Sequence, residues 1–212
     1  MFLENTLKYG KQFGWIEVVC GSMFSGKTEE LIRRLKRAKF AKLKVVIFKP
    51  IVDTRHKESK IVSHDKNKIK CKTVKSANEI YKLAYKCDVV GIDEAQFFDD
   101  EIIEVCNGLA NSGVRVIVAG LDMDYTGKPF GPMANLMATA EYVTKVHAIC
   151  SKTGGLAQYS HRKTKNDDLI MLGQEQEYEP LCRATFFKEM NKKTKKINVS
   201  GAADVSPKKS NK

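Results

Sequence analysis

The sequence predicts an α/β fold in which a parallel β-sheet is covered by helices on both faces. Short apolar runs alternate with amphipathic segments through the first two thirds of the 212-residue chain. The runs are apolar throughout, without the polar alternation of strands that face water on one side, and this is typical of strands buried on both faces. A chain of this length can form one sizeable core with a small appended subdomain.

The order of the elements follows from these runs and from the spacing of apolar residues between them. Leu31, Ile32 and Leu35 fall on one face of the first helix. Asp99 and Gly113 are the expected N-cap and stop signal of the second. The expected elements are a strand over 15–20, a helix over 28–38, strands over 44–48 and 88–93, a helix carrying residues 102–109, a strand over 114–119, a short helix over 133–140 and a strand over 142–149. Residues 150–187 are polar and weakly periodic.

The net charge of +12 is distributed unevenly. From Lys188 to the end the chain has eight lysines against Glu189 and Asp204, so half of the positive excess lies in this segment. A segment rich in Lys, Asn and Ser buries too little apolar surface to fold alone and is expected to be disordered. We interpret it as a solubilising tail rather than as a contact for RNA or an anionic surface.

The cysteines and the N-terminus favour a cytoplasmic protein. Six cysteines, at positions 20, 71, 87, 106, 150 and 182, form no C-x-x-C pair, which argues against a zinc ribbon or a disulfide framework. Scattered thiols fit a reducing compartment. The N-terminal residues lack the apolar region of a signal peptide, and no apolar run reaches the length of a membrane span.

A phosphate-binding loop follows the first strand. Gly21-Ser22-Met23-Phe24-Ser25-Gly26-Lys27-Thr28 matches G-x-x-x-x-G-K-S/T and stands directly between a strand and a helix. The glycines let backbone N–H groups point at phosphate oxygens, and the helix adds its positive N-terminal end. Lys27 would reach the β- and γ-phosphates, and the Thr28 hydroxyl would bind Mg²⁺. The sequence therefore predicts ATP binding by residues 21–28.

Two carboxylates follow the strand over 88–93. Asp93 ends this strand, where a second Mg²⁺ ligand is expected. Glu94 follows at once and points in a different direction, so it could take a proton from a substrate hydroxyl as the phosphoryl group moves. In a motor ATPase the same residue would orient water, and the residue chemistry alone leaves these two classes open. A switch GTPase is disfavoured, because Asn67-Lys68-Ile69-Lys70 lacks the acid of a guanine-specifying motif.

Several motifs together resemble the thymidine kinase family over residues 14–187. They are Gly-Ser-Met-Phe-Ser-Gly-Lys-Thr (21–28), Phe-Lys-Pro (48–50), Asp-Thr-Arg (53–55), Ser-His-Asp (63–65), Gly-Ile-Asp-Glu-Ala-Gln-Phe-Phe (91–98), Gly-Leu-Asp (120–122), Pro-Phe-Gly-Pro (129–132) and Tyr-x-x-x-Cys-Arg (178–183). The resemblance implies a P-loop NTPase with a RecA-like parallel sheet core and a small, loop-rich lasso subdomain. It also implies transfer of the ATP γ-phosphate to the 5′-hydroxyl of thymidine, and of deoxyuridine, in pyrimidine salvage.

The resemblance also assigns roles to single residues. Glu94 would be the general base, and Thr28 and Asp93 would hold Mg²⁺. Asp53, through a water, and Arg55 would position the metal and the phosphates. Ala95 and Gln96 would complete the ATP site. The remaining residues implied for the substrate pocket are Met23, Phe97, Leu121, Tyr125 and Phe130, with Ser160, Leu169, Met171, Gly173 and Tyr178 in a lasso over roughly 160–178 whose backbone reads the thymine edge.

The chain departs from the family at its structural zinc site. The family holds this zinc with two C-x-x-C pairs, whereas here the four positions are Cys150, Thr153, Cys182 and Thr185. Threonine is a poor zinc ligand, and a structural site almost always needs four protein ligands. The sequence therefore predicts that Cys150 and Cys182 alone do not hold zinc, with His147 and His161 as alternative ligands.

The resemblance further implies a homo-oligomer, and specifically a homotetramer. The expected layout is an N-terminal extension over 1–13, an ATP-binding α/β domain over 14–149, the lasso subdomain over 150–190 and a basic flexible tail over 191–212. The basic charge leaves one rival class, an ATP-driven nucleic-acid-binding P-loop ATPase. That class predicts ATP hydrolysis stimulated by DNA or RNA, without any need for a nucleoside.

Overall fold

A parallel six-stranded sheet forms the centre of the molecule. The computed structural model describes residues 14–52, 60–62, 68–84, 86–164 and 177–201. The strand order is β5-β2-β6-β7-β1-β8, and every adjacent pair is parallel. The bounds of these strands are Trp15–Gly21 for β1, Val45–Pro50 for β2, Lys72–Val74 for β5, Val89–Ile92 for β6, Arg115–Leu121 for β7 and Tyr142–Val146 for β8. The predicted α/β fold with a parallel sheet core is confirmed.

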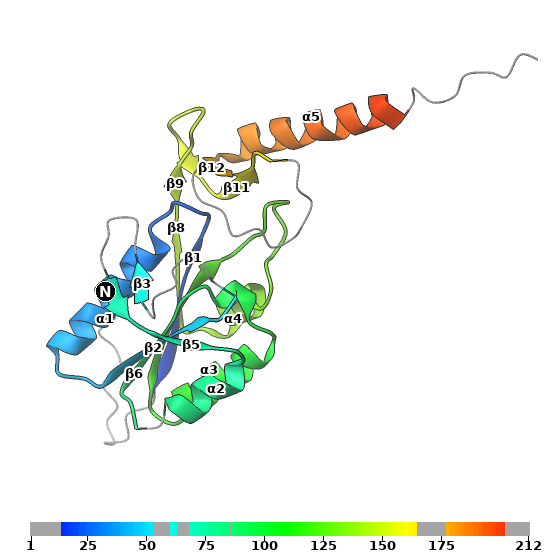
Figure 1. The fold of residues 1–212 in the computed structure, drawn as a ribbon. Helices are drawn as coiled ribbons and strands as arrows, with labels where there is room; N and C mark the ends of the chain where they lie inside the picture. The colour runs from blue at the N-terminus through cyan, green and yellow to red at the C-terminus, as the bar shows by residue number, and fades with distance from the viewer. Residues whose placement is uncertain (1–13, 53–59, 63–67, 85, 165–176, 202–212) are drawn as a thin grey trace, which may run out of the picture.

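Helices cover both faces of this sheet (Figure 1). Helix α1 (Lys27–Phe40) packs Leu31, Ile32 and Leu35 on one face, and α2 (Ala77–Leu83), α3 (Glu101–Asn111) and α4 (Met133–Thr139) cover the other. The central strands are buried from both sides, which explains their continuous apolar sequences.

Several short elements differ from the expectation. The strand expected over 142–149 divides at His147 into β8 and β9 (Ala148–Ile149). Helix α3 begins after Asp100 rather than after Asp99, and no side chain caps it. Helix α2 and the antiparallel pair β3 (Lys60–Val62) and β4 (Lys68–Lys70) were not expected. Elements of three to seven residues present too few positions for a periodic pattern to identify them.

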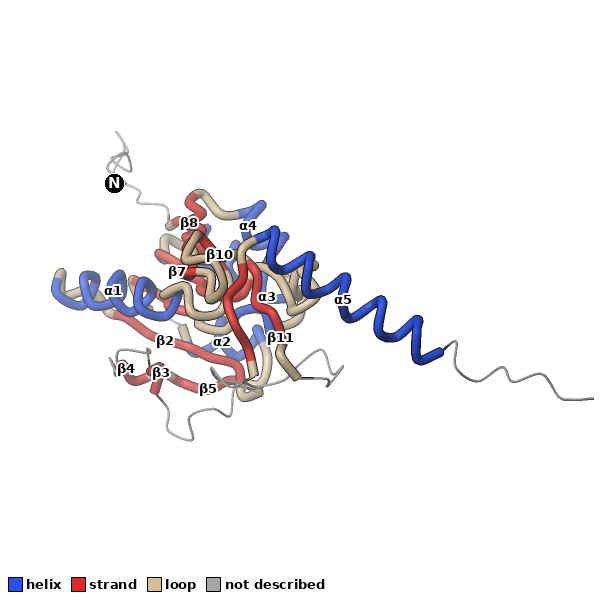
Figure 2. Tube along the Cα trace, turned by 90° about the horizontal axis from the view of Figure 1, so that it is seen from above, coloured by secondary structure: helices blue, strands red, loops and turns tan. Residues whose placement is uncertain are grey.

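A second, smaller unit follows β8. We call it the small subdomain: β9, β10 (Leu156–Ala157), β11 (Tyr159–Arg162), β12 (Tyr178–Leu181) and the first turns of α5 (Arg183–Gly201). Strand β9 pairs with β10, and β11 pairs with β12, both antiparallel. Its core consists of Ala148, Cys150, Ala157, Tyr159, Leu181 and Phe186. Figures 1 and 2 show α5 leaving this unit and extending away from the sheet.

Helix α5 continues beyond residue 190, where the basic flexible tail was expected to begin. Phe186 is fully buried and stacks on Tyr159 with ring centroids 4.3 Å apart, which fixes the first turn. A helix extends readily from a formed turn through Lys and Met, which have good helix propensity. The structure thus describes helix as far as Gly201 within the segment expected to be a basic flexible tail over 191–212, and the domain boundaries expected from the sequence stay predictions. The part of the chain that the structure describes holds no helix with the length and apolar character needed to cross a membrane.

Candidate active site

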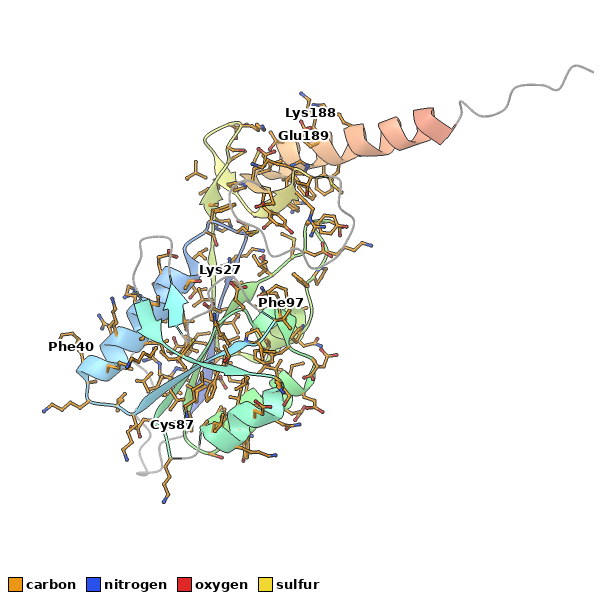
Figure 3. All side chains as sticks on the ribbon, viewed as in Figure 1. Lys27, Phe40, Cys87, Phe97, Lys188 and Glu189 are labelled. Carbon is orange, nitrogen blue, oxygen red and sulfur yellow. The ribbon has the colours of Figure 1, made fainter. Side chains whose placement is uncertain are left out.

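The candidate residues gather at the carboxyl edge of the sheet. The phosphate-binding loop follows β1, Asp93 follows β6, and Leu121 ends β7. Carboxyl ends of parallel strands share one edge, which is where α/β proteins bind ligands. Figure 3 shows Lys27 and Phe97 at the end of the sheet that faces the small subdomain, with Cys87 at the opposite end.

The phosphate-binding loop is closely fitted into the sheet. A Cβ atom added to Gly21 would lie 2.1 Å from the Val146 carbonyl oxygen, so the close approach of β8 requires glycine there. Lys27 Nζ donates a hydrogen bond to the Ser22 carbonyl oxygen at 2.7 Å, and Ser25 Oγ donates to the same oxygen at 2.7 Å. The Lys27 ammonium is therefore held over the loop that the sequence assigned to phosphate.

Glu94 has an unusual backbone conformation. Its φ and ψ of 55° and 40° lie in the left-handed region. Such a conformation costs about 1–3 kcal/mol in a residue other than glycine and is concentrated at functional sites. The Glu94 N–H donates to Asp93 Oδ1 at 3.0 Å, and Asp93 is 6% exposed. The Asp93 carboxylate thus accepts from the backbone of the next residue at the end of β6, and the separate roles of the two carboxylates stay predictions.

Gln96 holds the Glu94 side chain in place. Its Nε2 donates to Glu94 Oε2 at 2.6 Å, while its Oε1 accepts from the Leu121 N–H at 3.0 Å. Gln96 is buried and lies in the short 3₁₀ helix η1 (Ala95–Phe97). The sequence assigned Gln96 to the ATP site, but its contact with Glu94 was not expected. The Gln96 amide therefore anchors the proposed base to β7.

The donor atoms at this edge fit Mg²⁺. Thr28 lies in the first turn of α1, and Asp93 supplies a carboxylate. Hydroxyl and carboxylate oxygens are the protein ligands that Mg²⁺ prefers. These residues could hold the ion beside the phosphate-binding loop.

Asp122, just after β7, is a further carboxylate at this edge that the sequence reasoning left without a role. It is 3% exposed, and Lys145 Nζ lies 2.7 Å from its Oδ2. The two side chains form an ion pair, and neither Asp122 oxygen has a hydrogen-bond partner among the described residues. Burial raises the pKa of the nearby Cys20 thiol to about 11, and the Asp122 charge adds to this increase.

One group of predicted pocket residues joins the phosphate-binding loop to the small subdomain. The Met23 N–H donates to Ser160 Oγ on β11 at 2.9 Å. Phe24, with φ of 63°, and Met123 pack against the core of the small subdomain. The structure therefore brings together Met23 and Ser160, two residues that the resemblance assigned to the substrate pocket.

A second group of predicted pocket residues is joined by ring and cation contacts. Phe97 and Phe130 meet edge to face, with ring centroids 5.7 Å apart. The Arg162 guanidinium lies 3.8 Å from the centre of the Tyr125 ring, and its Nη2 donates to the Tyr178 hydroxyl at 2.7 Å. Tyr125 and Tyr178 are thus linked through one buried cation.

Arg162 was missed from the sequence. It is 1% exposed and lies on β11, two residues after Ser160. Its only sequence signal is a cation within the short run Tyr159-Ser160-His161-Arg162, which is buried throughout. Asp53, Arg55, Leu169, Met171 and Gly173 lie outside the described residues, so their predicted roles stay predictions.

The four positions of the family zinc site converge in the small subdomain. Thr185 Oγ1 lies 3.5 Å from Cys150 Sγ and 3.2 Å from Cys182 Sγ, and Thr153 Oγ1 donates to Cys182 Sγ at 3.7 Å. Burial raises the pKa of Cys150, but hydrogen bonds from Thr153, Thr185 and backbone amides outweigh it and lower the value to about 6. Two thiols and two neutral hydroxyls do not fit a closed zinc site.

His147 and His161, the alternative zinc ligands, do not replace the two missing cysteine ligands. His161 Nδ1 lies 3.1 Å from Glu179 Oε1, and His147 is exposed between β8 and β9. Within the ranges that the structure describes, no group of three or more His, Cys, Asp or Glu side chains is arranged to hold a metal. The donor chemistry here therefore disagrees with the zinc that the family implies.

Comparisons with known proteins agree on one family. The model of the thymidine kinase family matches residues 14–186. A thymidine kinase of Bacteroides thetaiotaomicron is 55% identical over 197 residues, covering 93% of this chain and 99% of the relative. That of Bacteroides fragilis strain YCH46 is 58% identical over 186 residues, covering 88% and 94%. That of a Rhodothermus species is 51% identical over 201 residues, covering 95% and 94%.

Solved structures give a more distant likeness. The AMPPCP-bound DnaA of Aquifex aeolicus matches with a TM-score of 0.40 and 19% identity. The match covers 68% of this chain and 44% of that protein.

Proposed function

This chain belongs to the thymidine kinase family, and we propose that the phosphate-binding loop, Asp93 and Glu94 carry out its reaction. The enzyme is an ATP-dependent phosphotransferase that moves the γ-phosphate to the 5′-hydroxyl of thymidine, and we propose deoxyuridine as a second acceptor. The observation that carries the assignment of residues is the Glu94 turn. A carboxylate in strained backbone, held by Gln96, stands at the same sheet edge as the loop.

The loop and Lys27 bind and orient the phosphates of ATP. Backbone N–H groups of residues 21–28 and the N-terminus of α1 supply partial positive charge, and Lys27 adds a full charge. In the structure the Lys27 ammonium is bonded to the Ser22 carbonyl oxygen. We propose that the β- and γ-phosphates replace this carbonyl as its partner. Thr28 and Asp93 would hold Mg²⁺, which neutralises charge on the phosphates when bound.

Glu94 acts on the nucleoside. Its carboxylate is proposed to accept the proton of the 5′-hydroxyl as the oxygen attacks phosphorus. Gln96 donates to one Glu94 oxygen and is itself held by the Leu121 N–H, so the carboxylate keeps one orientation. Met23, Phe97, Leu121, Tyr125 and Phe130 are proposed to surround the nucleoside, with Ser160 and Tyr178 closing the site.

Family membership decides against the nucleic-acid-stimulated ATPase that the basic charge had left open. The test is ADP release with Mg-ATP, measured without acceptor, with each deoxynucleoside and with single-stranded DNA. We expect ADP formation to depend on thymidine and, to a lesser extent, on deoxyuridine. Stimulation by DNA with no response to any nucleoside would overturn the proposal.

Two further properties are proposed from the family alone. We propose a homotetramer, for which sedimentation velocity is the direct test. We also propose a cytoplasmic location, in keeping with six scattered cysteines that form no C-x-x-C pair.

A further inference from the structure

The Cys150–Thr153–Cys182–Thr185 cluster has chemistry that the kinase reaction does not use. Its two thiols flank one hydroxyl, that of Thr185, and the Cys150 sulfur is also a hydrogen-bonding neighbour of Cys182. Thr185 Oγ1 is bonded to the Cys182 carbonyl oxygen as well, at 3.1 Å. The hydroxyl therefore keeps a backbone partner if the two sulfurs approach each other.

A small reagent that reacts with thiols can reach the cluster. Cys182 is partly exposed, Cys150 is 2% exposed, and residues 151–156 of the adjoining turn are exposed. The other four cysteines, at positions 20, 71, 87 and 106, are buried. Among the six, Cys182 is the thiol best placed to meet a reagent first, with a second thiol beside it.

We propose that Cys150 and Cys182 form a reversible disulfide site, closed by a small-molecule disulfide such as oxidised glutathione and opened by thiols. The Cys182 thiolate attacks one sulfur of the reagent, so its S–S bond breaks and one thiolate leaves. The Cys150 thiolate then attacks the Cys182 sulfur of the mixed disulfide, and the second thiolate leaves. The two protein thiols lose two protons and two electrons, and the reagent becomes two thiols.

The new bond would close a ring that contains part of the nucleoside site. Residues 150 and 182 enclose β11 and β12, and with them Ser160, Arg162 and Tyr178. A covalent link that closes such a segment stabilises the folded state by restricting the unfolded chain. The oxidised enzyme is therefore expected to resist unfolding of the segment that carries this part of the proposed nucleoside site.

The first test detects the bond itself. The purified chain is treated with oxidised glutathione, and its mass and peptide map are recorded without reduction. We expect a loss of two hydrogen atoms, a peptide pair that joins Cys150 to Cys182, and full reversal by dithiothreitol. Cys150→Ser and Cys182→Ser should lose this product, whereas Cys87→Ser, altered at the far end of the sheet, should form it as the wild type does. A stable glutathione adduct as the only product, or a bond between other cysteines, would overturn the proposal.

The second test separates the dithiol from a zinc site. We expect the wild type to purify without stoichiometric zinc, and the double variant Thr153→Cys/Thr185→Cys to bind one zinc ion per chain and to resist oxidised glutathione. The oxidised wild type should melt several degrees higher than the reduced form. One zinc ion per wild-type chain, or an unchanged melting temperature, would contradict the proposal.

The effect on thymidine rests on the proposed function, whereas the mass, zinc and melting measurements do not. We expect oxidation to change KM for thymidine more than kcat, because the closed segment carries Ser160, Arg162 and Tyr178. A chain without kinase activity that still formed the Cys150–Cys182 bond would contradict the function and leave the disulfide site standing.

Discussion

The phosphate-binding edge of the sheet and the small subdomain differ in how much their stability depends on side-chain contacts. At the edge, long parallel strands pair along their length, and the loop bonds to its own backbone. In the small subdomain, antiparallel strand pairs of only two and four residues are reinforced by side-chain contacts. Among these are the Tyr159–Phe186 stack between β11 and α5 and the Arg162–Tyr178 hydrogen bonds across the β11–β12 pair. Backbone contacts at the sheet edge limit which residues can occupy the phosphate-binding loop. Side-chain contacts in the small subdomain can be replaced by contacts between other residue types.

The largest kinetic effect is expected from removing the proposed base, Glu94. Glu94→Gln keeps the shape of the side chain but cannot accept the proton, so we expect kcat with thymidine to fall by about 10²–10⁴-fold. The melting temperature should change little. Steady-state kinetics with Glu104→Gln, an exposed change on α3, provide the control. Turnover close to wild type in Glu94→Gln would show that another group accepts the proton.

Substitution of two glycines with positive φ, one in each region, compares the two regions directly. A Cβ atom at Gly131 would lie 2.4 Å from the Gln96 carbonyl oxygen, whereas one at Gly154, in the turn between β9 and β10, would meet nothing within 4 Å. Gly131→Ala should therefore displace the Gln96 turn and with it Glu94. We expect a fall in kcat of about 10²-fold, as misplaced catalytic groups commonly cause.

Gly154→Ala is the matched control, because it carries backbone strain without a clash. We expect it to cost about 1 kcal/mol of stability and to leave kcat unchanged. Equal kinetic effects of the two changes would mean that the Gln96 contact does not matter.

A buried ion cluster stabilises the sheet away from the active edge. Glu17 on β1 accepts from Arg34 at 2.8 Å and from Arg115 at 2.6 Å. Burial raises the Glu17 pKa, but hydrogen bonds and charge from Arg115, Trp15 and Arg34 outweigh it, so the pKa is lowered from its ordinary value of 4.5. Glu17→Gln should lower the free energy of unfolding by about 2 kcal/mol and leave KM for thymidine unchanged.

The same change has a defined pH dependence. A carboxyl whose pKa is lowered on folding contributes stability above its unfolded pKa, and this contribution is lost as the pH falls through the folded value. The difference between wild type and Glu17→Gln should therefore shrink below about pH 4.5. Urea unfolding across this range measures it, and a difference that grew on acidification would contradict the assignment.

The smallest expected effect tests the side-chain links of the small subdomain. Arg162→Met keeps much of the volume but removes the hydrogen bonds to the Tyr178 hydroxyl and the cation over Tyr125. We expect KM for thymidine to rise about tenfold, the size of one lost charged hydrogen bond, with a smaller change in kcat. Arg183→Met, an exposed change in the same unit, should leave KM unaltered. An unchanged KM in Arg162→Met would separate Arg162 from the pocket.

The same contrast explains how much could be predicted from the sequence. The phosphate-binding loop, Asp93 and Glu94 could be proposed from the sequence because each follows a strand within a few residues. A site of this kind is recognisable from residues that are neighbours in the chain. The Gln96–Leu121 bond and the Arg162–Tyr178 pair join positions far apart in the chain, which a single sequence cannot reveal. Strands β9 to β12 are too short for a periodic pattern, and α5 continues from a turn fixed by the Tyr159–Phe186 stack.

The hydrogen bond from the Met23 N–H to Ser160 Oγ joins the loop proposed to hold the phosphate donor to β11, the strand proposed to close on the acceptor. We therefore expect a movement of Ser160 on nucleoside binding to reach the loop, and a movement of the loop on ATP binding to reach Ser160. On this proposal the two substrates are thermodynamically linked. Linkage is reciprocal, so the factor by which ATP changes the dissociation constant of thymidine equals the factor by which thymidine changes that of ATP.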